Sequence, residues 1–214
     1  PCTNAVAFTQ DDDFILSTSK VWDRHTLQHS AFVKKHEGNV SSVAFSYDDA
    51  IILSGYDDGN IELRESDSLN SMGTIGRQSG SITSVSFSSD NTLILSSYSD
   101  RTLRLWNISS QQCIASTKGF DGRISSVVFS NDDSLVLSIS DTKNLELRDG
   151  YSLKFIASMD LYLNYFTHDE AFTLSYSEDG ILQLLDRRSQ QCIVSVNQYD
   201  DRGIKSIAFN QNSV

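Results

Sequence analysis

The chain has 214 residues, with 28 Asp and Glu against 17 Lys and Arg, and therefore a formal net charge of −11 at pH 7. Its cations are scattered, which argues against binding to the phosphate backbone of nucleic acid or to a membrane surface. No apolar run reaches the length of about 18 residues that predicts a transmembrane helix. Three cysteines make no disulfide framework and favour a reducing compartment. We therefore expect a cytoplasmic protein, with the nucleus as the alternative.

Short apolar segments that precede a polar turn recur along the whole chain. They are Val6–Phe8, Val43–Phe45, Val85–Phe87, Val127–Phe129, Asn164–Phe166 and Ile207–Phe209. The turns are rich in Asp, Asn and Ser, whose side chains hydrogen-bond the nearby backbone. A second apolar run follows each of the first five turns, as at Ile51–Leu53, and its length is typical of a strand rather than a helix.

One complete unit predicts four strands. They are Val40–Ser46, Ile51–Gly55, Asn60–Glu65 and approximately Asn70–Gly76. In the third of these, Ile61 and Leu63 alternate with Glu62 and Arg64. Alternation with a period of two predicts a strand that is buried on one face only.

The ends of the third strands set the period of the chain. They are Val21–Asp23, Leu63–Glu65, Leu105–Asn107, Leu147–Asp149 and Leu184–Asp186. The steps between their middle residues are 42, 42, 42 and 37 residues. Such a period with a Trp-Asp-like ending is typical of propeller repeats. We therefore predict an all-β fold, a β-propeller of four-stranded antiparallel blades with about five visible repeats.

The repeats also suggest how the chain is organised. Their approximate bounds are 1–35, 36–77, 78–119, 120–160 and 161–199, with a sixth beginning at 200–214. Because the first and last segments lie inside repeats, we expect a single propeller that is part of a longer chain and a larger ring. Two repeats are five residues short, the first between its second and third strands and the fifth before its first strand, so we expect an uneven rim.

The stretch from His36 to Ile61, and the stretch from Leu95 to Asn107, resemble the WD-repeat family. In that family a His, a Ser or Thr of the second strand, an Asp of the next turn and the Trp of the third strand form a hydrogen-bonded tetrad. The resemblance implies such a structural network at His36, Ser54, Asp58, Ser96, Asp100, Trp106 and Asp179.

No repeat contains the complete tetrad. Arg64 and Arg148 stand at the Trp position of their repeats, and Gln78 stands at a His position. We therefore expect the blades to be held mainly by apolar packing and by hydrogen bonds between strands, with stability that differs from blade to blade.

The loops before the first strand and between the second and third strands lie on one face of a propeller, where similar proteins hold a peptide or a partner. Candidate partner-binding residues on this rim are Asn39, Asp57, Ser81, Ser99, Arg123, Asp141 and Glu178. Arg123 could bind a carboxylate with two hydrogen bonds. The alternative is a solvated rim with no specific partner, because single surface charges contribute little.

The sequence contains no hydrolase elbow, phosphate-binding loop, zinc-protease or dinucleotide motif. We therefore expect no catalytic residue, cofactor or metal site, and predict a protein–protein interaction scaffold whose rim loops bind a protein or peptide. We expect no nucleic-acid, membrane or small-molecule partner. The alternatives are a propeller-based hydrolase or lyase, and a regulatory sensor array fused to an effector domain outside this chain.

Overall fold

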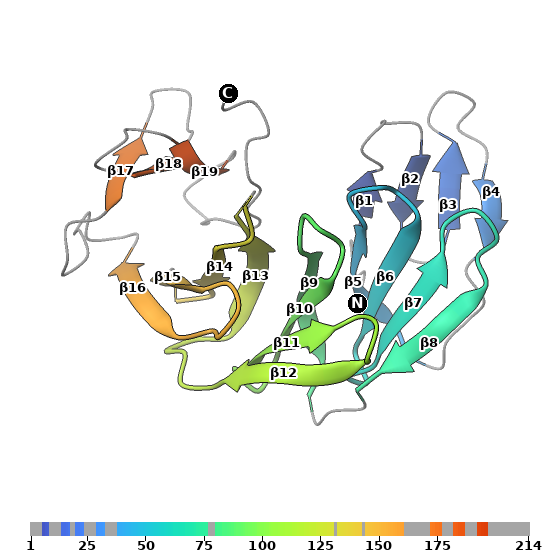
Figure 1. Cartoon of the computed structure of the whole chain (residues 1–214), viewed down its shortest axis with the longest axis horizontal. Helices are drawn as coiled ribbons and strands as arrows, with labels where there is room; N and C mark the ends of the chain where they lie inside the picture. Colours follow the sequence, from blue (N-terminus) through green and yellow to red (C-terminus); the bar gives the residue numbers. More distant parts are fainter. Residues whose placement is uncertain are drawn as a thin grey trace.

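The computed structural model shows five antiparallel β-sheets that follow one another along an arc (Figure 1). It describes residues 6–8, 14–17, 20–23, 29–32, 38–76, 80–130, 132–142, 144–160, 172–176, 182–186 and 192–196. In these residues all regular structure is β-strand, which confirms the predicted all-β fold. The same residues contain no helix that is long and apolar enough to span a bilayer.

Each sheet is one blade, with its strands paired in chain order. Blade one contains β1 (Val6–Phe8), β2 (Phe14–Ser17), β3 (Lys20–Asp23) and β4 (His29–Phe32). Blade two contains β5 (Val40–Phe45), β6 (Ile51–Tyr56), β7 (Ile61–Glu65) and β8 (Ser71–Ile75). Blade three contains β9 (Ile82–Phe87), β10 (Leu93–Tyr98), β11 (Leu103–Asn107) and β12 (Gln112–Thr117).

Blade four contains β13 (Ile124–Phe129), β14 (Leu135–Ser140), β15 (Asn144–Asp149) and β16 (Phe155–Asp160). The described strands of blade five are β17 (Phe172–Tyr176), β18 (Leu182–Asp186) and β19 (Cys192–Val196). The segments Asn164–Phe166 and Ile207–Phe209, for which first strands were predicted, lie outside the described residues. In blade two the observed strands agree with the predicted ones to within one residue at each end.

The apolar core lies between neighbouring blades. The first strands stand side by side, with β9 packed against both β5 and β13. One buried cluster joins Leu53 and Leu63 of blade two to Ile82 and Phe87 of blade three. A second cluster joins blade three to blade four. Each blade therefore covers the apolar face of the next, as the repeat predicts.

The turns between first and second strands also connect neighbouring blades. Asn91 Oδ1 accepts a hydrogen bond from the backbone N–H of Tyr47 in the preceding blade, at 2.8 Å. One blade later, the Asp133 carboxylate accepts the N–H of Ser89 at 2.8 and 2.9 Å. Asn91 and Asp133 have φ angles of 57° and 58°, a left-handed conformation that Asn and Asp tolerate. Local turn chemistry thus holds one blade against another.

Serine hydroxyls make a second set of polar links between the first strands. Ser42 Oγ accepts the N–H of Val85 at 3.1 Å, and Ser84 Oγ accepts the N–H of Val127 at 3.2 Å. The two links are related by the 42-residue step of the sequence. They fix the relative positions of the strands from which the rim residues extend.

Candidate functional site

The predicted rim residues of blades two, three and four meet in pairs. In each blade the residue that opens the first strand lies beside the turn residue that follows the second strand, 18 positions later. The pairs are Asn39 with Asp57, Ser81 with Ser99, and Arg123 with Asp141. We call each of them a rim pair. Glu178 lies outside the described residues.

Two backbone hydrogen-bonding groups of the opening residue are satisfied in every rim pair. Its carbonyl oxygen accepts the N–H of the turn residue, at 2.9 Å in blade two and 2.8 Å in blades three and four. Its own N–H donates to the side chain of the turn residue. The acceptors are Asp57 Oδ1 at 2.8 Å, Ser99 Oγ at 3.0 Å and Asp141 Oδ1 at 2.9 Å. This reciprocal bonding fixes the two loops against each other.

A glycine precedes the opening residue in all three blades, at Gly38, Gly80 and Gly122. A Cβ on Gly122 would clash with Asp141 Oδ1, and one on Gly38 would lie 2.9 Å from Asp57 Oδ1. In blade three the contact is looser, because a Cβ on Gly80 would lie 3.4 Å from Ser99 Oγ. In blades two and four, glycine therefore leaves the space that the turn carboxylate occupies.

The side chains of the rim pairs differ in their exposure and in their hydrogen bonds. Asn39 directs its amide back to Asp57 Oδ2 at 2.8 Å, so both members of that pair are engaged with each other. Ser81 and Ser99 are half-buried. Arg123 is exposed, and among the described residues no hydrogen bond or ion pair involves its guanidinium. Arg123 is therefore the rim-pair side chain best placed to contact a partner.

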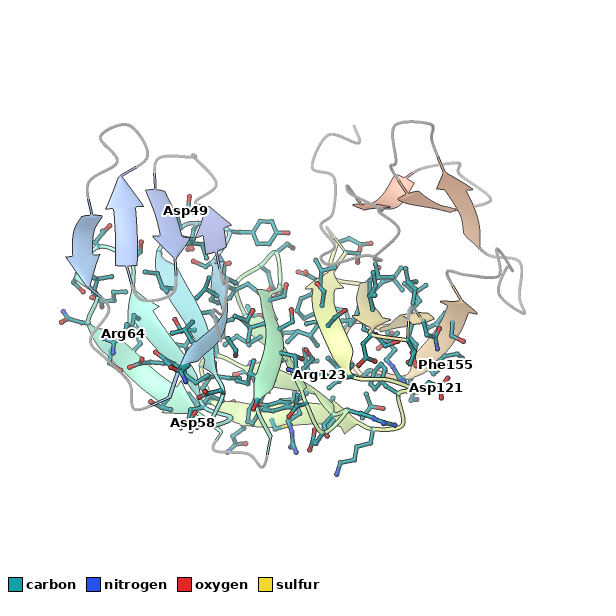
Figure 2. The ribbon with its side chains drawn as sticks, turned by 180° about the vertical axis from the view of Figure 1, so that it is seen from behind. Asp49, Asp58, Arg64, Asp121, Arg123 and Phe155 are labelled. Carbon is teal, nitrogen blue, oxygen red and sulfur yellow. The ribbon has the colours of Figure 1, made fainter. Side chains whose placement is uncertain are left out.

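The rim faces away from the turns that join first and second strands. Figure 2 shows Asp58 and Asp121 near one edge of the blades and Asp49 at the opposite edge. Besides the rim pairs, exposed charges on this rim come from Asp58, Asp100, Arg101, Lys118 and Asp121. The rim is thus predominantly acidic, with cations at three described positions.

The structure places the implied tetrad residues unevenly. In blade three, Trp106 Nε1 donates to Ser96 Oγ at 2.8 Å, and the Ser96 hydroxyl is 3.3 Å from that of Tyr98. Asp100 instead accepts the N–H of Thr102 at 3.0 Å within its own turn. Trp106 also lies against the preceding blade, where a Cβ on Gly76 would clash with its ring.

In blade two the residues at the tetrad positions have different hydrogen-bond partners from those in blade three. Asp58 accepts the backbone and side-chain N–H groups of Asn60 at 3.1 and 2.8 Å. Ser54 is buried at 2% exposure beside strand β7. His36 and Asp179 lie outside the described residues.

In blade two, where Arg64 stands at the Trp position, the structure contains a buried ion pair. Arg64 Nη2 lies 2.6 Å from Glu62 Oε1, and Tyr56 donates its hydroxyl to Glu62 Oε2 at 2.8 Å. Arg64 Nη1 donates to the carbonyl of Leu69 at 2.8 Å. Burial, and then the hydrogen bond to Glu62, raise the pKa of Tyr56.

Blade four repeats this arrangement with Glu146 and Arg148, whose Oε2 and Nη2 atoms lie 2.7 Å apart. The Arg148 guanidinium is 4.6 Å from the centre of the Phe120 ring, and its Nη1 donates to Thr117 Oγ1 of the preceding blade at 3.3 Å. Burial raises the pKa of Glu146, while the hydrogen bond from Arg148 works in the opposite direction.

The prediction that the third strands are buried on one face only was wrong for β7 and β15. Glu62 and Arg64 are 6% and 7% exposed, as are Glu146 and Arg148, and Thr117 and Phe120 lie against the Arg148 guanidinium. A Glu two residues before each Arg was the available signal, since residues i and i+2 share a face of a strand. Each ion pair lies within one strand, and in blade four its arginine also contacts Thr117 of the preceding blade.

Four-stranded antiparallel sheets that stack face to face with a period of 42 residues define a β-propeller type of repeat protein. The family model described as "WD domain, G-beta repeat" matches residues 25–63 and 69–107, which supports the resemblance to the WD-repeat family. Repeats of this family generally mediate protein–protein interaction. No curated protein matched the sequence. In the described residues no group of three His, Cys, Asp or Glu side chains is arranged to hold a metal ion.

Proposed function

We propose that this protein is an interaction scaffold whose rim binds a protein or peptide partner through a carboxylate held by Arg123. The supporting observation is the rim pair of blade four. Its reciprocal hydrogen bonds at 2.8 and 2.9 Å fix the backbone at Arg123, while the guanidinium is exposed. A rigid surface loses little conformational entropy on binding. A guanidinium matches the planar geometry of a carboxylate.

The remaining features of the proposal follow from charge. A chain with a net charge of −11 attracts phosphate backbones and anionic membranes weakly, so we propose a proteinaceous partner rather than nucleic acid or lipid. Binding alone, without a chemical step, is the proposed activity. We propose a cytoplasmic location, with the nucleus as the alternative.

The test begins with selection of peptides from a random displayed library on the immobilised protein. The selected peptides should carry Asp or Glu. Labelled copies should lose about tenfold or more in affinity on Arg123→Glu, because a hydrogen bond to a charged group contributes about 1.5–3 kcal/mol. Fluorescence anisotropy measures the affinity.

Arg101→Glu is the matched control, because it makes the same charge change at another exposed arginine of this rim. It should leave the affinity nearly unchanged. Selection of basic peptides, or equal losses in the two variants, would contradict binding through Arg123.

A further inference from the structure

We infer that Asp141, predicted from the sequence as a partner-binding residue, is instead a positioning residue for Arg123. This inference rests on the proposed function, since it concerns the residue through which the partner binds. In this inference the Asp141 carboxylate holds the backbone of the rim in place, and the Arg123 guanidinium binds the partner.

In blade four, Asp141 both accepts a hydrogen bond from the Arg123 backbone and donates one to it. Its Oδ1 accepts the Arg123 N–H at 2.9 Å, and its own N–H donates to the Arg123 carbonyl at 2.8 Å. The absence of a side chain on Gly122 leaves room for this oxygen, because a Cβ there would clash with it. The carboxylate thus fixes the backbone from which the Arg123 side chain extends.

Blade three shows that this position requires an acceptor rather than a charge. Ser99 holds the place of Asp141, and its neutral hydroxyl accepts the Ser81 N–H at 3.0 Å. The reverse bond, from the Ser99 N–H to the Ser81 carbonyl, is 2.8 Å long, as in blade four. Serine is therefore a substitute that the same fold already uses at this position.

The negative charge of Asp141 has a separate effect on an acidic partner. An exposed carboxylate bonded to the residue that binds an anion repels that anion. Removing the charge while keeping the acceptor should therefore leave the affinity for an acidic peptide equal or higher. Removing the acceptor as well should lower it, because Arg123 then occupies more conformations.

The experiment compares Asp141→Ser with Asp141→Ala. The first reading is amide hydrogen exchange at Arg123 in the free protein, which requires no partner. We expect exchange about tenfold faster in the alanine variant, the order expected for loss of one hydrogen bond, and exchange close to that of the unaltered protein in the serine variant. Unchanged protection of strands β14 and β15 verifies that the alanine variant is folded.

The second reading is the affinity for the acidic peptides selected on the unaltered protein. Asp141→Ser should bind them at least as tightly, and Asp141→Ala several-fold more weakly, so that serine rescues what alanine loses. Equal losses in both variants would overturn the inference, since they would assign the carboxylate to the partner. Unchanged exchange at Arg123 in Asp141→Ala would overturn it as well. If instead the proposed function is wrong, Arg123→Glu will bind the peptides with full affinity, and this result differs from both outcomes above.

Discussion

At the scale of residues, the position that holds Trp106 in blade three determines how one blade contacts the preceding one. Trp106 fills the space beside Gly76 and donates one hydrogen bond to Ser96. Arg148 reaches Thr117 of the preceding blade instead, and it brings Glu146 with it as a counter-charge. The arginine is thus part of a two-residue replacement for tryptophan. Removing one member should be more harmful than removing both.

Arg148→Ala should lower the free energy of unfolding by about 3–5 kcal/mol near pH 8, because it leaves the Glu146 carboxylate buried without a counter-charge. Burial already raises the pKa of Glu146, so the loss should shrink as the pH falls and the carboxyl group takes up a proton. Urea unfolding measures both effects. The pair Glu146→Leu with Arg148→Met should be more stable than the single variant. A double variant as unstable as Arg148→Ala would contradict this account.

At the scale of elements, the turn between the first and second strands has the same hydrogen bonds in blades two, three and four. A serine hydroxyl donates to the aspartate two residues later. The same hydroxyl accepts the N–H of the residue five positions after the serine. The aspartates are Asp48, Asp90 and Asp132. For Asp48 and Asp132 the serine bond is the largest influence, and it lowers the pKa of the carboxyl group. For Asp90 burial opposes this, yet its hydrogen bonds from Ser88 and Thr92 still lower the pKa.

These turns predict a loss of stability in acid. Their aspartates have pKa values below the ordinary one, so the unfolded chain binds more protons than the folded chain as the pH falls below about 4. The stabilisation is present above that pH and is lost below it. Ser88→Ala should raise the pKa of Asp90 and flatten the dependence of unfolding free energy on pH between about 2 and 4. Denaturant titrations across this range measure the slope.

Ser110→Ala is the control for the acid experiment. Its hydroxyl donates to Asn107, an amide that does not titrate, at 2.9 Å. The variant should change stability without changing the pH slope. A steeper slope in Ser88→Ala, or the same slope change in both variants, would contradict the role of the turns.

The contrast between these turns and the third strands explains what the sequence could predict. The Ser-x-Asp turns depend on neighbours within five residues, so composition alone predicts them. The alternation within β7 shows only that its two faces differ in polarity, so it does not reveal that Glu62 is buried. Likewise, the sequence placed Arg123 and Asp141 on one rim. Their hydrogen bonds depend on a contact between residues 18 positions apart, which only the folded structure reveals.

At the scale of the whole molecule, the segments matched by the family model and the structural blades are out of register. The family match at 25–63 covers β4 of blade one, β5 and β6 of blade two, and the first three residues of β7. The match at 69–107 covers β8 of blade two and β9, β10 and β11 of blade three. Each matched segment therefore spans the boundary between two blades. The polar links from Tyr47 to Asn91 and from Val85 to Ser42 join the first match to the second, and the blades therefore form a continuous stack.

A continuous stack presents one rigid rim, and the central claim is that this rim is the binding surface. Hydrogen exchange with mass spectrometry, in the presence of a selected acidic peptide, tests it most directly. The account predicts slower exchange in the segments that open the first strands, above all around Arg123, with outer strands β8 and β12 unchanged. Protection of those outer strands, with unchanged exchange around Arg123, would contradict it.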